Sequence, residues 1–387
     1  MNKNLSILFF TLVVVMIGFG IIIPILPFYI ESFGGGGFSM GILMSIFATM
    51  QFIFAPVWGS LSDRIGRKPV LMLGILGNAF AMLFMGLSNN LWTLFVSRAL
   101  AGVLSSATQP TAMAFIGDST SDKDRGGGMG VIGAAMGIGM VLGPGMGGLL
   151  SGISLSTPFY LAAGLSLLAA ILAWFLLPES LPPDRRSVSP AKRAPQWKSL
   201  LEAATGPLGF LLILAFLTSF ALTNFESVFG LYSARRFHYD AATVGLVLTI
   251  IGLIAAIVQG ALTGPATRKF GDENVVKASL IGSAVGFGIL LLATDLPGVM
   301  LTSAIFIFSN AMIRPGVSTL VSKRATSGQG MALGLNNSFM SLGRIFGPLL
   351  AGYLLDINLS FPYMTGALLM LVGFIASLVY LGQSKSI

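Results

Sequence analysis

The stretch "GPLGFLLILAFLTSFALTNFESVFGLY", residues 206–232, contains a single charged side chain, Glu226. At 1.5 Å per residue it is long enough to cross the roughly 30 Å hydrocarbon core of a bilayer as a helix. Lipid offers no hydrogen bonds to backbone groups, so a spanning segment of this kind must be helical. A charge near the centre of such a helix costs about 2.5–3.5 kcal/mol. We therefore expect the carboxylate of Glu226 to have a function that offsets this cost.

The whole chain has a similarly apolar composition. Of its 387 residues, 55% are hydrophobic and 9% are charged, whereas soluble domains carry about a quarter charged residues. The sequence therefore predicts an all-α polytopic membrane protein. Cysteine is absent and His238 is the only histidine, which excludes disulfides and metal sites built on thiolates or several histidines. The spans hold no catalytic cluster and the chain has no nucleotide-binding loop, so we expect neither an enzyme nor a cofactor.

Twelve transmembrane helices are predicted, with even-numbered spans followed by basic segments. They cover roughly residues 6–31, 39–61, 70–89, 92–117, 127–151, 157–178, 206–232, 241–264, 275–293, 297–322, 329–354 and 361–382. Seventeen of the 22 Lys and Arg residues fall in the termini and in these basic segments, while the opposite loops hold only Arg235 and Arg236. The positive-inside rule then places both termini in the cytoplasm. The net charge of +8 is a topology signal and a contact for anionic lipids, not a nucleic-acid patch.

The chain also contains an internal repeat. A polar stretch rich in Pro, Ser and basic residues, 178–199, separates six spans from six. The segment "GMVLGPGMGG" (139–148) matches "GRIFGPLLAG" (343–352). We predict two pseudo-symmetric six-helix bundles, residues 1–178 and 206–387, joined by a cytoplasmic linker, 179–205. In such repeats the substrate site lies between the halves near mid-membrane.

The loop "GSLSDRIGRKPVL" (59–71) resembles the signature loop G-x-L-x-D-R-x-G-R-K of the major facilitator superfamily. The resemblance implies the major facilitator fold and a cytoplasmic latch that forms when the cavity faces outward. Gly59 and Gly66 would allow close helix approach and a tight turn. Asp63 would accept hydrogen bonds from a helix N-terminus, and Arg67 would pair with Asp63 or with Asp118. The alternative is a basic loop that only sets topology.

Span five carries the pattern G-x-x-x-G-P-x-x-G-G, which resembles a motif of the antiporters in this superfamily. Its residues are Gly139, Gly143, Pro144, Gly147 and Gly148. Glycines let helices pack closely, and proline removes a backbone hydrogen bond and bends the span. We expect a tightly packed seam that closes the cavity outside and discourages proton leak. A generic packing seam of small residues is the alternative.

Span four contains Arg98 in "LFVSRALAG", which resembles a family motif, L-x-x-x-R-x-x-x-G, whose arginine is tied to proton coupling. A buried guanidinium cannot lose its proton, so it must be paired or hydrated. A structural brace, with Arg98 bonded to backbone carbonyls, is the alternative.

Glu226 is the candidate proton carrier. Burial favours the neutral form of a carboxyl group, so Glu226 can bind and release a proton as the cavity alternates. When ionised it would also attract a cationic drug, and this competition is sufficient for exchange. The alternative is a side chain at the outer interface that extends into water.

Several aromatic and amide side chains are predicted to line a cavity for large amphiphilic ligands. These candidate substrate-binding residues are Phe47, Gln51, Asn224, Phe225, Phe229, Tyr232, Phe306, Asn310, Asn336, Asn337 and Phe339. For any one of the aromatic rings, helix packing or lipid contact is the competing explanation.

The segments "NFESVFGLY" and "NAMIRPGVS" resemble those of bacterial multidrug and quinolone efflux antiporters, and the resemblance extends along the whole chain. It implies proton-coupling roles for Glu226, for Arg314 and for a carboxylate three residues before that arginine. This chain has Ala311 there instead. Three alternatives follow: Glu226 alone carries the proton, the substrate range has changed, or the coupling differs. Arg344 is a further cation inside a span.

We therefore expect a proton-coupled antiporter in the cytoplasmic (inner) membrane that exports amphiphilic, often cationic drugs by alternating access. Its expected partners are small-molecule substrates, protons and membrane lipids, and it is expected to act as a monomer. The alternative is an exporter or flippase of an endogenous lipid-like molecule or metabolite with the same fold.

Overall fold

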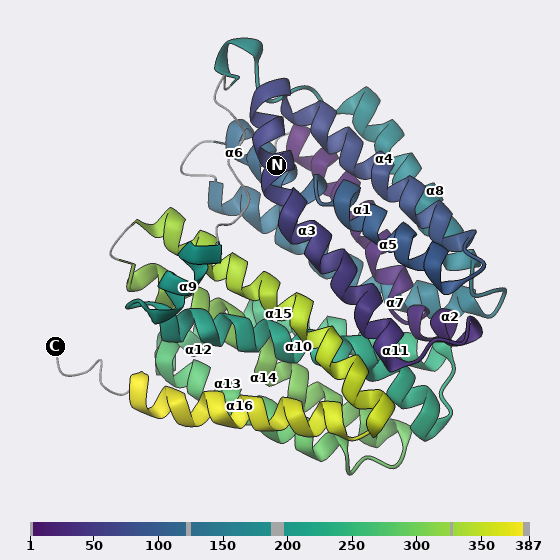
Figure 1. Cartoon of the computed structure of the whole chain (residues 1–387). Helices are drawn as coiled ribbons and strands as arrows, with labels where there is room; N and C mark the ends of the chain where they lie inside the picture. Colours follow the sequence, from purple (N-terminus) through teal and green to yellow (C-terminus); the bar gives the residue numbers. More distant parts are fainter. Residues whose placement is uncertain (1–2, 121–124, 187–196, 326–327, 382–387) are drawn as a thin grey trace. The chain divides into compact units, whose positions relative to one another are not determined.

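The computed structural model of the chain describes residues 3–120, 125–186, 197–325 and 328–381. Every regular element in these ranges is helical (Figure 1). Twelve helical stretches among the described residues are long and apolar enough to cross a membrane. Both the predicted all-α class and the predicted number of spans are confirmed.

The first six spans are interrupted at two places, in the first span and in the fourth. The helices are α1 (Lys3–Ile22), α2 (Leu26–Ser32), α3 (Gly37–Ile65), α4 (Arg67–Gly86), α5 (Leu91–Ser105), α6 (Thr108–Ser119), α7 (Arg125–Ser151) and α8 (Thr157–Leu176). α1 ends before Pro24, and α5 gives way to α6 four residues before Pro110. Proline has no N–H to donate to the carbonyl four residues earlier, so the helix breaks there.

The last six spans follow a 3₁₀ turn, Pro183–Arg185, and a short helix. The helices are α9 (Trp197–Thr205), α10 (Gly209–Phe237), α11 (Ala241–Ile257), α12 (Thr263–Phe270), α13 (Asp272–Leu290), α14 (Leu296–Lys323), α15 (Gln329–Ile357) and α16 (Phe361–Tyr380). A π-helical turn, Val258–Leu262, joins α11 to α12 within the eighth span. Residues 187–196 of the predicted linker lie outside the described residues.

The helices form two compact units. The first contains the described residues of 1–34, 46–194 and 240–249, and the second contains those of 35–45, 195–239 and 250–387. Within the first unit α1 packs on α7 and α8, and α4 packs on α5 and α8. Within the second unit α10 packs on α15 and α16 in the same way, and α13 packs on α14 and α16. The predicted repeat of six spans is therefore present in the helix packing.

Each unit has its own core. In the first, Leu8, Val15 and Phe115 are fully buried within a cluster that α1, α4, α6, α7 and α8 share. In the second, the rings of Phe225, Phe287 and Phe306 contact one another between α10, α13 and α14. Dense cores of this kind fix the helices that carry the candidate site residues.

Candidate functional site

The loop between α3 and α4 is organised around Arg67, which is 7% exposed. Its Nη1 lies 2.5 Å from Oδ1 of Asp63, and its Nε lies 2.8 Å from Oδ2 of Asp118. Nη1 also donates to the hydroxyl of Ser62 at 2.8 Å. Arg67 thus pairs with both of the predicted carboxylates, and it ties the start of α4 to α3 and α6.

The N-terminus of α4 is capped by Glu179, which the sequence analysis missed. The backbone N–H of Arg67 donates to Oε1 of Glu179 at 2.9 Å, and that of Lys68 donates to Oε2 at 3.2 Å. The expectation that Asp63 accepts from a helix N-terminus is therefore wrong, because Asp63 lies in the last turn of α3 and pairs with the Arg67 side chain. Glu179 follows α8 outside any recognisable motif, so only the fold brings it to α4.

The two glycines of this loop have different surroundings. Gly66 has φ of 111°, and a Cβ there would collide with Oε2 of Glu179. At Gly59 an added Cβ would meet only Cβ of Pro110, at 3.9 Å. The tight turn expected at Gly66 is present, whereas the close helix approach expected at Gly59 is not found.

A second unpredicted cap lies at the start of α3, within the second unit. The backbone N–H groups of Gly37 and Phe38 donate to the carboxylate of Asp356 at 2.7 and 2.8 Å. The same carboxylate lies 3.5 Å from Nη1 of Arg235. One acidic residue at the end of α15 therefore holds the first turn of α3.

The glycine motif of α7 packs closely against neighbouring helices. A Cβ on Gly139 or Gly143 would collide with Met16 or Gly20 of α1. A Cβ on Gly147 would collide with the carbonyl of Ile21. Pro144 lies inside the continuous helix α7, and Gly148 faces α11, where a Cβ would lie 2.7 Å from the carbonyl oxygen of Ala241.

Arg98 on α5 is 5% exposed and lies against an aromatic ring. Its guanidinium carbon is 4.3 Å from the ring centroid of Phe47 on α3. Phe47 also makes an edge contact with Phe19, and Gln51 follows one turn later, half-buried. Two predicted site residues are thus brought together as a cation–π pair.

The second unit carries Glu226, Arg344 and Arg314 inside three of its spanning helices. Glu226 on α10 and Arg344 on α15 are half-buried, and Arg314 on α14 is exposed. Arg344 lies within electrostatic range of Glu226, and Arg314 lies within range of Arg344. Ala311 is buried with Val258 and other apolar side chains.

The predicted aromatic ligands of α10 and α14 pack against one another. Phe225, Phe229 and Phe306 are fully buried, with ring centroids 5.0 Å apart for Phe225 and Phe229 and 4.9 Å apart for Phe225 and Phe306. Tyr232 is also buried and accepts a hydrogen bond from Nη1 of Arg236 at 2.8 Å. In this structure these rings are part of the hydrophobic core of the second unit. Their contact with a ligand stays a prediction.

The predicted amide ligands differ in accessibility. Asn224 is buried and donates to the carbonyl of Pro362 at 3.0 Å. Asn336 is buried and donates to the hydroxyl of Ser318 at 3.2 Å. Asn310 is buried, and Asn337 is exposed. Phe339, the remaining predicted ligand on α15, is an aromatic residue and is 7% exposed.

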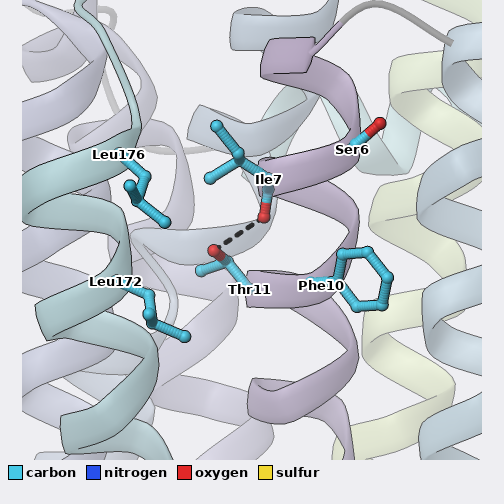
Figure 2. Close-up of a pocket in the computed structure, with 6 residues that line it drawn as sticks. All are labelled: Ser6, Ile7, Phe10, Thr11, Leu172 and Leu176. Carbon is cyan, nitrogen blue, oxygen red and sulfur yellow. Dashed lines mark hydrogen bonds between the residues drawn. The ribbon is translucent and has the colours of Figure 1, made fainter.

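A pocket of about 420 Å³ lies between α1 and α8 in the first unit, and the side chains that line it are drawn in Figure 2. It is lined by Ser6, Ile7, Phe10, Thr11, Leu172 and Leu176. The Thr11 hydroxyl donates to the Ile7 carbonyl at 2.9 Å. None of the predicted site residues lines this pocket, and its walls are mostly apolar. Among the described residues, no group of three or more His, Cys, Asp or Glu side chains could hold a metal ion.

Solved structures show the same fold. The nucleoside transporter NupG superposes with a TM-score of 0.77 at 17% identity, covering 98% of this chain and 99% of the other. The human organic anion transporter MFSD10 superposes with a TM-score of 0.72 at 23% identity, covering 97% of this chain and 99% of the other.

Sequence relatives extend along nearly the whole chain. Multidrug resistance protein 2 of Bacillus subtilis (strain 168) is 31% identical over 369 residues, which are 95% of this chain and 92% of the relative. Quinolone resistance protein NorA of Staphylococcus aureus (strain COL) is 29% identical over 386 residues, 98% of this chain and 97% of the relative. The resemblance to bacterial efflux proteins is confirmed.

The sequence profile of the Major Facilitator Superfamily matches residues 8–262 and 211–386. Together with twelve spans and the repeated helix packing, this match shows a multi-pass membrane transporter of small molecules. The chain belongs to the Major Facilitator Superfamily.

Proposed function

We propose that this protein is a proton-coupled antiporter that exports amphiphilic, often cationic compounds across the cytoplasmic membrane by alternating access. Two of its relatives, at 31% and 29% identity, are named for multidrug and quinolone resistance. They match it over more than nine tenths of its length, which supports a transport function like the one for which they are named.

The carboxylate of Glu226 carries the proposal. It lies in the interior of α10 and makes no hydrogen bond or ion pair with any residue that the structure describes. It is only half-buried, so a proton or a cationic group can reach it. A proton and a cation that compete for one carboxylate are exchanged when the protein alternates. The membrane potential supplies about 2.3 kcal/mol per charge per 100 mV.

The other predicted residues support this cycle. The pairing of Arg67 with Asp63 and Asp118 is proposed as the cytoplasmic latch, since these ion pairs join the start of α4 to the ends of α3 and α6. Arg98 is proposed to act in proton coupling from its position against Phe47. Both termini are proposed to lie in the cytoplasm, with the protein acting as a monomer in contact with anionic lipids.

A second candidate function is the export or flipping of an endogenous lipid-like molecule. The observation that favours it is the pocket between α1 and α8, whose mostly apolar walls would suit contact with an acyl chain. Movement of a fluorescent phospholipid between leaflets of reconstituted vesicles, without dye export, would favour this candidate.

The first prediction concerns Glu226→Gln. Because the amide cannot exchange a proton, dye export driven by a pH gradient in reconstituted vesicles is expected to fall to the level of protein-free vesicles. Proton release from the detergent-purified protein on addition of a cationic dye is expected to disappear as well. Glu202→Gln, which changes an exposed carboxylate on α9, is the matched control and should keep both activities. Normal exchange by Glu226→Gln would refute the proposed role.

A further inference from the structure

The interior of the second unit has more positive than negative charge. Glu226, Arg314 and Arg344 lie inside α10, α14 and α15, whereas the other charged residues of the spanning helices of this unit lie within two turns of a helix end. Two cations near helix ends have carboxylate partners: Lys323 lies 2.5 Å from Asp272, and Arg324 lies 2.6 Å from Glu273. The interior therefore holds two cations and one carboxylate.

The three interior side chains are not paired in this way. Within residues 197–325 and 328–381, neither arginine donates a hydrogen bond to a side chain or carbonyl, and neither forms an ion pair. A guanidinium cannot lose its proton, so both arginines stay charged. One ionised Glu226 offsets only one of them, and a protonated Glu226 offsets neither. α14 supplies no counter-ion itself, because the residue one turn before Arg314 is Ala311.

The two arginines are also accessible. Arg314 is exposed and Arg344 is half-buried. Asn337, Ser341 and Arg344 occupy one face of α15, at the i, i+4 and i+7 positions. Asn337 is exposed and Ser341 is half-buried, so this face is polar around the cations. A guanidinium fork binds carboxylates and other planar or tetrahedral oxyanions through paired hydrogen bonds.

We propose that Arg314 and Arg344 form a binding site for an acidic group, a carboxylate or sulfonate, on an amphiphilic ligand. The inference rests on the proposed function in one respect: it assumes that transported compounds contact the face of α15 that carries Arg344. It adds that acidic amphiphiles are bound in preference to neutral compounds with the same apolar body. Export of such an anion is also favoured by a membrane potential that is negative inside.

The test uses two fluorescent probes that differ by one group. 8-Anilinonaphthalene-1-sulfonate carries a sulfonate that N-phenyl-1-naphthylamine lacks. Both are titrated against the full-length protein in nanodiscs of zwitterionic lipid. We expect the sulfonate probe to bind about tenfold or more tightly, as hydrogen bonds to charged groups require. Arg314→Gln and Arg344→Gln should each reduce this preference severalfold, while the affinity for the neutral probe, which reports folding, stays the same.

Two matched pairs sharpen the test. Arg268→Gln removes an exposed cation at the end of α12 and should leave the preference unchanged. Ser341→Asp places a carboxylate one turn before Arg344 and should reduce the preference, whereas the uncharged Ser341→Asn should not. Equal binding of the two probes by the unmodified protein would overturn the proposal, as would a full preference in the Arg314→Gln and Arg344→Gln variants.

The outcome is separable from that of the proposed function, because binding is measured without a gradient. If the protein prefers the sulfonate probe and its export is unchanged by Glu226→Gln, the anion site is supported and proton exchange at Glu226 is refuted. Gradient-driven export that depends on Glu226, together with equal binding of the probes, would refute only the anion site.

Discussion

At the scale of single residues, the loop between α3 and α4 shows why one glycine of a motif is needed and another is not. Gly66 has φ of 111° and ψ of 160°, a conformation available almost only to glycine. It also lies against the Glu179 carboxylate that caps α4. Gly59 has neither a positive φ nor a close neighbour.

Gly66→Ala is therefore expected to destabilise the protein by about 1–3 kcal/mol through backbone strain, with a further loss from displacement of Glu179. The measurement is the midpoint of thermal unfolding of the purified protein in detergent. Gly59→Ala is the matched control, since its new methyl group would make only an ordinary contact with Pro110. Equal unfolding midpoints for the two variants would contradict this account.

At the scale of helices, two glycine seams repeat across the chain. Gly139, Gly143 and Gly147 of α7 approach the backbone of α1. In the second unit, Gly343 of α15 faces the Phe216 carbonyl of α10, and Gly347 faces Phe220. Helices in lipid associate through close packing rather than through the hydrophobic effect, so these seams hold each unit together.

The two units also correspond in the close contacts that glycines near the starts of α11 and α3 make with α7 and α15. A Cβ on Gly245 of α11 would lie 2.6 Å from the carbonyl oxygen of Pro144 in α7, and one on Gly41 of α3 would collide with the carbonyl of Pro348 in α15. The sequence match of residues 139–148 with 343–352 therefore reflects a repeated set of helix contacts.

Gly147→Ala is predicted to separate α7 from α1, because its methyl group would overlap the Ile21 carbonyl. Overpacking of this kind costs about 1–3 kcal/mol. Gly133→Ala on the same helix is the matched control, since nothing lies within 4 Å of its added Cβ, and alanine favours a helix interior by roughly 0.5–1 kcal/mol. Thermal unfolding in detergent compares the two, and a Gly147→Ala variant as stable as Gly133→Ala would refute the seam.

At the scale of the whole molecule, the distribution of charge predicts orientation. Most Lys and Arg residues fall on one side of the twelve spans, which the positive-inside rule assigns to the cytoplasm. Arg98 in α5, Arg314 in α14 and Arg344 in α15 are different, because they lie inside spanning helices. Orientation and the proposed transport chemistry thus depend on separate sets of charges.

The predicted orientation can be tested with single cysteines, because the chain contains none of its own. Asn89, between α4 and α5, and Asp184, after α8, are both exposed. In intact cells a membrane-impermeant maleimide should label Asn89→Cys, whereas Asp184→Cys should react only after permeabilisation. The reverse pattern would place both termini outside the cell.

The parts of the candidate site that could be predicted are those formed by residues close together in the sequence. Arg67 and Asp63 are one helical turn apart, and they do pair. The glycines of span five recur at the spacing of one helix face, and they do form a seam. Glu179 and Asp356 could not be predicted, because each caps a helix distant in sequence. Likewise, periodicity alone does not distinguish a ring such as Phe225 that packs on other rings from one that faces a ligand.

The sequence by itself determined that the chain crosses the membrane as twelve helices in two related halves, because lipid leaves an apolar segment of that length no other way to satisfy its backbone. Tertiary structure alone decided which carboxylates cap α3 and α4, which aromatic rings are buried against one another, and which arginines stay without a carboxylate partner in the described part of the second unit. The physical reason is that such pairings depend on which helices become neighbours. That choice is made by packing across the whole unit and is not encoded in any local pattern.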